Sequence, residues 1–190
     1  MNLRLFAGAR WHDVNSSSQP LWHAEYPIEQ TLHSQESETR LRLIREPWRR
    51  RASVDTVHVA DHGGLRILGR CEDRLQRAVA TLMSSYRDDV VVEAPVVRFV
   101  HGVQMLEPWM DVLVNVRERY CDLVEGDFMR RRGSFHRLSR TGGAFVLEGE
   151  APLADLLGYS AWLRELTGED PNVAMWLSRY LPIDSGPKAA

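Results

Sequence analysis

The stretch from Leu106 to Pro182 contains a complete series of secondary-structure signals and restricts the fold more than any other part of the chain. Apolar residues alternate where a strand is expected and recur at helical spacing where a helix is expected, and turn-forming residues separate these segments. The predicted elements are a strand (Met110–Val116), a helix (Tyr120–Arg131), a hairpin turn (Gly142-Gly143), a second helix (Leu153–Leu166) and a last strand (Val173–Tyr180). Elements in this order predict a βαββαβ domain of the ferredoxin-like type.

The first half of the chain repeats this order between Pro20 and Gly102. The expected elements are a strand (Leu21–Glu29), a helix that starts at Ser37, a hairpin turn (Gly63-Gly64), a second helix (Glu72–Arg87) and a last strand (Asp89–Val100). Pro95 lies inside the last of these strands. Because proline cannot donate to a sheet ladder, a bulge or an edge position is expected there.

The repeated order predicts an α+β protein with two tandem ferredoxin-like (βαββαβ) α/β sandwich domains that have antiparallel sheets. An N-terminal extension covers residues 1–19, the two domains cover residues 20–102 and 103–183, and a tail covers residues 184–190. A domain of about 80 residues has a small core, so we expect the two domains to pack on each other.

The charge balance excludes a role as a bulk polyanion binder, because the net charge is -2 over 190 residues. Any nucleic-acid contact must therefore come from a local patch. Every basic residue except Lys188 is an arginine, whose planar guanidinium binds phosphate and stacks on bases. The arginine usage fits such a patch, and it equally fits a bias in genome composition.

Two arginine-rich segments are candidate RNA contacts. The first lies at the end of a predicted helix and on the strand after it, and comprises Arg130, Arg131, Arg132, Arg137 and Arg140. Its residues fit either an RNA contact or a structural helix C-terminus. The second, a secondary basic patch, comprises Trp48, Arg49, Arg50 and Arg51. An aromatic ring beside three cations suits phosphate binding with base stacking, and it also suits a solvated helix end.

No motif predicts catalysis, a cofactor or a metal site. The phosphate-binding motif GxxxxGK[ST] does not occur in the sequence, so nucleotide binding is not expected. His58 and His62 flank a hairpin and could in principle bind a metal, but turn histidines are more typically solvated. Cys71 opens a helix without a partner base, and Cys121 has no metal-ligand spacing, so free thiols in a reducing cytosol are expected. Neither a membrane span nor a secretory signal is expected.

The second half resembles the last domain of translation elongation factor G and of the tetracycline-resistance ribosomal protection proteins. The matching residues are Leu106, Glu107, Pro108, Gly126, Asp127, Arg131, Arg132, Gly133, Gly142, Gly143, Pro152, Leu153, Gly158, Tyr159, Leu163, Arg164, Leu166 and Thr167. The resemblance implies a domain that lies against the large ribosomal subunit, near the stalk base and the sarcin-ricin loop. It adds Tyr159, Arg164 and Thr167 to the candidate ribosome-binding residues.

The first half resembles the third domain of the same family, in its hairpin and helix over residues 63–79 and its strand over residues 94–100. Glu72 keeps its place, but Arg74 stands where the family has a histidine. In the second half, the family continues with Gln-Gly-Arg after its threonine, whereas Thr167 is followed by Gly168, Glu169 and Asp170. Residues 100–106 form only a short connection where the family has its fourth domain, and no GTPase domain is present in this sequence.

These features predict a cytoplasmic, non-catalytic, elongation factor G-like protein that associates with the ribosome or rRNA and lacks GTPase activity. The expected partner is large-subunit rRNA or a stalk-base protein, without a membrane, a nucleotide or a cofactor. One alternative is a protein-interaction or assembly module, such as a homo-oligomer, that kept the fold but not the ribosome. Another is a small enzyme on a ferredoxin-like scaffold, of the acylphosphatase kind.

Overall fold

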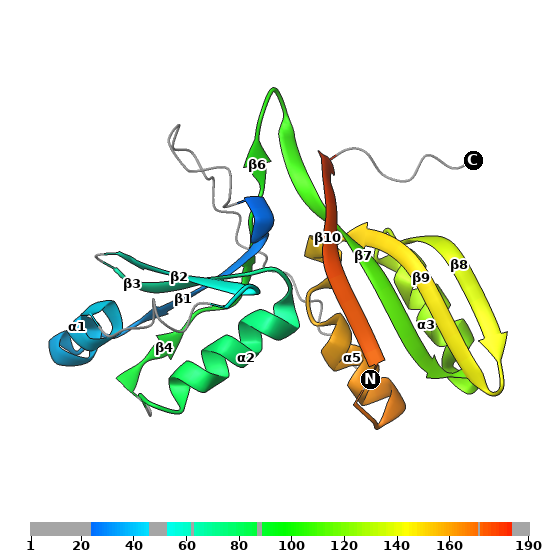
Figure 1. Cartoon of the computed structure of the whole chain (residues 1–190), viewed down its shortest axis with the longest axis horizontal. Coiled ribbons are helices and arrows are strands. Elements are labelled where there is room, and N and C mark those ends of the chain that lie inside the picture. The colour runs from blue at the N-terminus through cyan, green and yellow to red at the C-terminus, as the bar shows by residue number, and fades with distance from the viewer. Residues whose placement is uncertain (1–23, 46–52, 62, 87–88, 171, 184–190) are drawn as a thin grey trace, which may run out of the picture.

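Two antiparallel sheets lie side by side in the part of the chain that the structure describes (Figure 1). The structure is a computed structural model, and it describes residues 24–45, 53–61, 63–86, 89–170 and 172–183. The predicted α+β class with tandem ferredoxin-like domains is confirmed. The predicted extension over residues 1–19 and the predicted tail over residues 184–190 lie outside the described residues, and the exact domain boundaries remain predictions.

The first sheet contains β1 (Ile28–His33), β2 (Thr56–Asp61), β3 (Gly64–Gly69), β4 (Val91–Val92) and β5 (Val96–Val97). Its order is β2-β3-β1-β4, and β5 also pairs with β1. The order is ferredoxin-like when β4 and β5 are taken as one edge strand that is interrupted around Pro95. The N–H groups of Glu93 and Arg98 donate to the carbonyls of Thr31 and Pro27, at 2.9 and 2.8 Å. Pro95 therefore lies at a sheet edge, as predicted.

The strand predicted over Leu21–Glu29 overlaps β1 only at its end, because β1 begins at Ile28 and continues to His33, while residues 21–23 lie outside the described residues. Residues 24–25 form a short helical turn instead. Pro27 explains the start, since it has no N–H to contribute to a ladder. Leu32 at the far end of β1 is fully buried and pairs with Leu65 of β3.

Helices α1 (Ser37–Arg45) and α2 (Glu72–Met83) pack against this sheet. The predicted apolar face of α2 is buried through Leu75, Val79 and Leu82. This spacing of four and three residues places the three side chains on one side of the helix. The helix ends before the predicted Arg87, since residues 84–86 form turns.

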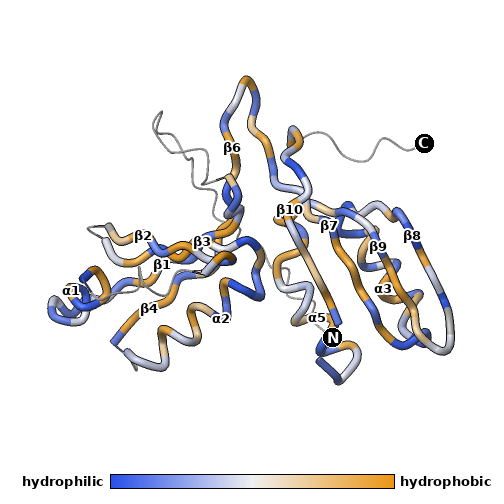
Figure 2. Tube along the Cα trace, viewed as in Figure 1, coloured by the Kyte–Doolittle hydropathy of each residue, from blue (hydrophilic) through white to orange (hydrophobic). Residues whose placement is uncertain are grey.

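The second sheet contains β6 (Val100–His101), β7 (Met105–Arg117), β8 (Ser134–Thr141), β9 (Ala144–Pro152) and β10 (Asn172–Pro182). Its order is β10-β7-β9-β8, with β6 paired to β7. Figure 2 shows hydrophobic residues concentrated on the central strands β7 and β9 and more hydrophilic ones on the edge strand β8. Alternate residues Met110, Val112 and Val114 of β7 are buried and define the helix-facing side of the sheet.

The second domain has a short 3-10 turn, η4 (Glu118–Tyr120), followed by α3 (Cys121–Arg130), α4 (Leu153–Leu156) and α5 (Tyr159–Thr167). The single helix predicted over Leu153–Leu166 is therefore wrong. The helix breaks at Leu157, which is extended, and at Gly158, which has φ +76. Only glycine adopts this left-handed conformation without steric cost, so the break occurs at this residue.

The two domains contact each other, as predicted from their small size. The Gly158 N–H donates to Glu72 Oε2 at 2.7 Å, and Ser160 Oγ lies 3.1 Å from Asp73 Oδ2. Buried apolar residues of both domains belong to one connected cluster. Among the described residues, no helix is long and apolar enough to cross a membrane.

Candidate nucleic-acid interface

The C-terminal end of α3 carries the predicted Arg130-Arg131-Arg132 run, and its backbone closes in a Schellman motif. The Gly133 N–H donates to the Phe128 carbonyl at 3.0 Å, and the Arg132 N–H donates to the Met129 carbonyl at 3.1 Å. Arg132 has φ +58, a conformation that usually belongs to glycine. A non-glycine residue persists there only if its surroundings compensate for the cost.

The side chain of Arg132 supplies that compensation through three charged hydrogen bonds. Its Nη1 and Nη2 donate to the two carboxylate oxygens of Glu107, at 2.8 and 2.9 Å, and its Nε donates to Asp155 Oδ2 at 2.6 Å. Glu107 is only 2% exposed. The hydrogen bonds to Glu107 raise the pKa of Arg132. Arg132 thus fastens the end of α3 to β7 and α4, which is the structural alternative considered for this run.

Arg131 also binds residues within its own domain. Its Nε donates to Asp127 Oδ2 and its Nη1 to the Asp155 carbonyl, both at 2.6 Å. Its guanidinium lies over the Tyr159 ring, 5.1 Å from the centroid, and 5.9 Å from that of Trp162. Tyr159 is completely buried, and burial raises the pKa of its hydroxyl. Tyr159 therefore presents no surface to a ligand in this conformation.

Arg130 differs from its two neighbours because its side chain is 74% exposed, with one ion pair of 3.6 Å to Asp127. Arg137 is 68% exposed and lies 3.6 Å from Glu148 of β9. Arg140 lies near Asp122 and Glu125 of α3, at 3.6 and 3.7 Å. Arg140 therefore faces the helices.

Arg137 faces the opposite side of the second sheet, because it is an odd number of strand positions from Arg140. Its partner Glu148 is directly opposite Leu113 in the ladder, next to the helix-facing Val112 and Val114. The candidate arginines of the first segment are consequently divided between two faces. Arg130 and Arg140 lie on the helix side, and Arg137 lies on the open side of the sheet.

The last two candidates, Arg164 and Thr167, lie at the end of α5. Arg164 Nη2 donates to Asp170 Oδ1 at 3.0 Å, and Glu169 pairs with Arg117 of β7. The Thr167 hydroxyl donates to the Leu163 carbonyl at 2.8 Å. The acidic pair that departs from the family pattern thus neutralises the two nearby arginines.

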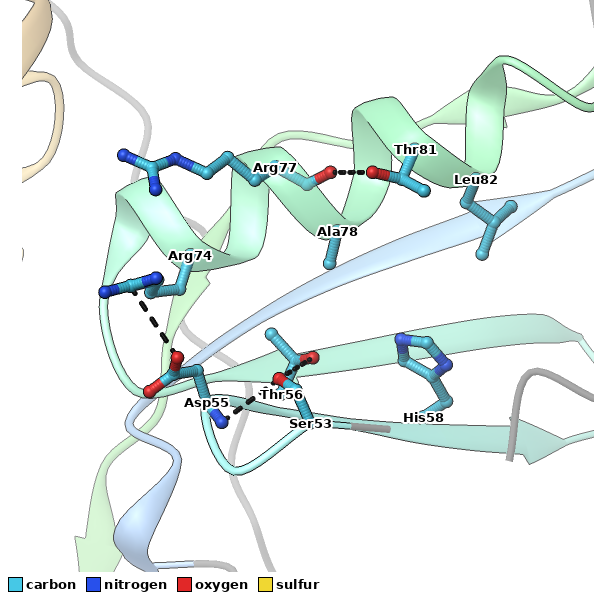
Figure 3. A pocket seen from close by; sticks show the side chains of 9 residues that line it. All are labelled: Ser53, Asp55, Thr56, His58, Arg74, Arg77, Ala78, Thr81 and Leu82. Atoms are coloured by element: carbon cyan, nitrogen blue, oxygen red, sulfur yellow. Dashed lines mark hydrogen bonds and ion pairs between the residues drawn. The ribbon is translucent and has the colours of Figure 1, made fainter. Parts of the chain in front are cut away.

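The first domain contains a hollow of about 300 Å³ between α2 and β2 (Figure 3). Its charged lining includes Arg74, Arg77 and Asp55, and Arg74 Nε lies 3.7 Å from Asp55 Oδ2. His58 also lines the hollow, whereas His62, which flanks the same hairpin, lies outside the described residues. The secondary basic patch of Trp48, Arg49, Arg50 and Arg51 lies outside them as well.

Cys71 is the N-cap of α2 and is not activated there. Burial raises the pKa of its thiol, which lowers the thiolate fraction at neutral pH. Both Cys71 and Cys121 are free thiols. The geometry does not favour a nucleophilic cysteine.

The sequence indicated most of the arginines but not the acids that bind them. Asp127 stands four residues before Arg131 on α3, a spacing that could have identified this pair. Glu107 and Asp155 are 25 and 23 residues away from Arg132, and no local pattern connects them.

Comparison with known proteins identifies relatives of the second half. Residues 104–190 match the family described as Elongation factor G C-terminus. Elongation factor G 2 of Hahella chejuensis is 39% identical over 84 residues, which are 44% of this chain and 12% of that protein. Ribosome-releasing factor 2, mitochondrial, of Danio rerio is 36% identical over 84 residues, 44% of this chain and 11% of that protein. Elongation factor G of Granulibacter bethesdensis is 33% identical over 82 residues. The match thus spans only about an eighth of the length of these relatives.

Proposed function

We propose that the protein is a translation-related factor that binds the ribosome without GTPase activity, because residues 104–190 match the family described as Elongation factor G C-terminus. The proposed partner is large-subunit rRNA or a stalk-base protein. The match over residues 104–190 carries this proposal, because it covers strands β7 to β10 of the second sheet and helices α3 to α5. We further propose that the first domain is related to the third domain of the same family.

We assign the RNA contact first to Arg130, because its guanidinium is the most exposed of the α3 run. Arg131 and Arg132 keep the end of α3 in shape through Asp127, Asp155 and Glu107. An arginine with few internal partners loses little when its hydrogen bonds move to a phosphate. In this proposal, Arg131 and Arg132 act as supports for the surface that Arg130 extends.

The test is sucrose-gradient sedimentation of the full chain with purified ribosomes at low and high salt. Bound phosphates release counterions, so we expect co-sedimentation at low salt that decreases as salt rises. Arg130→Ala removes one phosphate contact and is expected to lower the salt slope by about one. Arg137→Ala probes the open face of the sheet in the same assay, and Arg40→Ala on α1 of the first domain is the matched control.

Failure to co-sediment at low salt would overturn the proposal. Binding that is equally strong at both salt concentrations would also contradict a phosphate-based interface. A loss in Arg137→Ala but not in Arg130→Ala would move the interface to the open face of the sheet and leave ribosome binding intact. Binding of a fluorescent GTP analogue would contradict the proposed lack of nucleotide chemistry.

A second candidate function is assembly with another copy of this chain. The Arg164–Asp170 and Arg117–Glu169 pairs favour it, because they remove the positive charge that an RNA contact at the end of α5 requires. Trp176 on β10 is 50% exposed and could lie in such an interface. Light scattering coupled to size-exclusion chromatography tests this, with Trp176→Ser as the variant. A monomer at all concentrations would contradict it.

We place the protein in the cytoplasm, as the sequence predicts. The two free thiols support a reducing compartment, because disulfides are rare there. One of the relatives carries "mitochondrial" in its name. Fractionation of cells of the source organism, with an antibody to the protein, would distinguish the cytoplasm from an organelle.

A further inference from the structure

Three side chains of residue types that commonly bind metals lie close together on the open face of the second sheet. They are Asp111 of β7, His136 of β8 and Glu150 of β9, and one potential ligand atom of each lies within 4.8 Å of the others. Asp111 and Glu150 are direct partners in the β7–β9 ladder, so they point to the same side. The neighbouring Met110 and Val112 point to the other side and are buried.

A β-bulge brings His136 into this group. Phe135 is paired with Gly149 and Arg137 with Glu148, so β8 has one residue more than β9 at this point. Such an extra residue is left out of the ladder and bends the strand, which re-aims its side chain. Here the extra residue is His136, and its ring lies near the carboxylate of Glu150.

Glu150 provides a second, independent indication of a ligand. The residue is 7% exposed, and its Oε1 accepts a hydrogen bond from Arg179 Nη2 of β10. Its Oε2 is buried and has no hydrogen-bond partner among the described residues. A buried carboxylate oxygen without a partner is costly, and a bound cation removes this cost. Arg179 meanwhile fixes the orientation of the carboxylate, as outer-shell partners of metal ligands do.

Asp111 supplies a second carboxylate that is free to bind. Its carboxylate makes no side-chain hydrogen bond or ion pair with any residue in the described ranges. The charged groups at the site are then two carboxylates and the Arg179 guanidinium, with a net charge of about -1. A divalent cation reverses this charge, whereas a monovalent one only neutralises it.

We propose that Asp111, His136 and Glu150 form a binding site for a divalent transition-metal ion, of the zinc class. One imidazole nitrogen and two carboxylate oxygens are a ligand set that zinc accepts, and three protein ligands leave a position open to water. The ion connects the three neighbouring strands β7, β8 and β9. The site departs from the sequence analysis, in which no motif predicted a metal site and only His58 and His62 were considered as a metal pair. It does not depend on ribosome binding.

The test is isothermal titration of the full chain, stripped with a chelator, with zinc chloride. We expect saturable binding of a single ion at this site, and a visible absorption band when cobalt(II) replaces zinc. His136→Gln and Asp111→Asn each remove one ligand and are expected to weaken binding by about tenfold or more. Trp176 lies directly opposite Asp111 in the β10–β7 ladder, so its fluorescence should change in the same titration.

Two control variants separate this site from other zinc-binding groups. Glu148→Gln changes an acid on the same strand but outside the three-residue group, and His33→Gln changes a histidine of the first sheet. Both are expected to bind zinc with an affinity within about twofold of the unaltered chain. No binding at millimolar zinc, or unchanged affinity in His136→Gln and Asp111→Asn, would overturn the proposal. Circular dichroism of each variant establishes that a loss of affinity is not a loss of fold.

Discussion

The carboxylate of Glu72 accepts a hydrogen bond from the backbone N–H of Gly158, at 2.7 Å, across the contact between the two domains. Gly158 precedes α5, so this carboxylate caps the start of a helix in the other domain. The same Glu72 begins α2 of its own domain. The residue thus fixes the position of the break between α4 and α5 relative to the first domain.

We predict a pH-dependent contribution of Glu72 to stability. Burial raises the pKa of its carboxyl, and the Gly158 N–H only partly opposes this. The folded chain therefore holds this proton more tightly than the unfolded chain. The contribution is fully present below the ordinary pKa of glutamate, and it is lost as the pH rises through the raised pKa of the folded state.

Urea unfolding of the unaltered chain and of Glu72→Gln across this pH range tests the prediction. The free energy of unfolding of the unaltered chain, minus that of the variant, should fall as the pH rises. Glu165→Gln, on the exposed side of α5, is the matched control and should show no such trend. A difference that increases with pH would mean that the Gly158 hydrogen bond outweighs burial.

Arg132 and Arg130 should differ sharply in their effect on stability. Arg132→Ala leaves the buried Glu107 carboxylate without its bidentate partner, which is expected to cost about 2–4 kcal/mol. Arg130→Ala removes an exposed ion pair and is expected to change stability by less than about 0.5 kcal/mol. Denaturant unfolding measures both. Equal effects of the two substitutions would contradict the structural role of Arg132.

Two glycines, one inside α3 and one just after its C-terminal end, provide a second contrast. A Cβ at Gly133 would lie 2.4 Å from the Phe128 ring and 2.6 Å from the Phe128 carbonyl oxygen, so Gly133→Ala should cost about 1–3 kcal/mol. A Cβ at Gly126 would contact nothing within 4 Å, and Gly126 lies inside the helix. Gly126→Ala should therefore stabilise the protein by about 0.5–1 kcal/mol. Thermal unfolding of the two variants gives opposite shifts if this is correct.

The half-buried Tyr180 and the fully buried Tyr159 should respond in opposite ways to loss of the hydroxyl. Tyr180 Oη donates to the Ala24 carbonyl at 2.8 Å, so Tyr180→Phe is expected to destabilise the chain by about 0.5–1.5 kcal/mol. The Tyr159 hydroxyl is buried and has no hydrogen-bond partner among the described residues. Tyr159→Phe should be neutral or stabilising by about 1 kcal/mol. Chemical denaturation decides this, and a large loss in Tyr159→Phe would indicate a partner for its hydroxyl.

Local signals in the sequence were sufficient to predict the order of the elements, the hairpin turns and the apolar face of α2. Periodicity and turn residues act over a few positions, so a single segment reveals them. Because these signals act only over a few positions, they do not reveal features that depend on contacts between residues far apart in the chain. The sequence alone predicts Gly158 inside a single helix, whereas in the structure the helix breaks at Gly158, whose N–H is bound by Glu72, 86 residues away.

The sequence by itself determined that this chain folds into two βαββαβ domains and that the second resembles the end of elongation factor G. Only the tertiary structure decided that Arg132 binds Glu107 and Asp155 inside the domain while Arg130 reaches solvent. It also decided that Asp111, His136 and Glu150 meet. The partners of Arg132 lie 25 and 23 residues away in the chain, and the group of Asp111, His136 and Glu150 depends on strand register and on one β-bulge. Neither arrangement leaves a local pattern in the sequence.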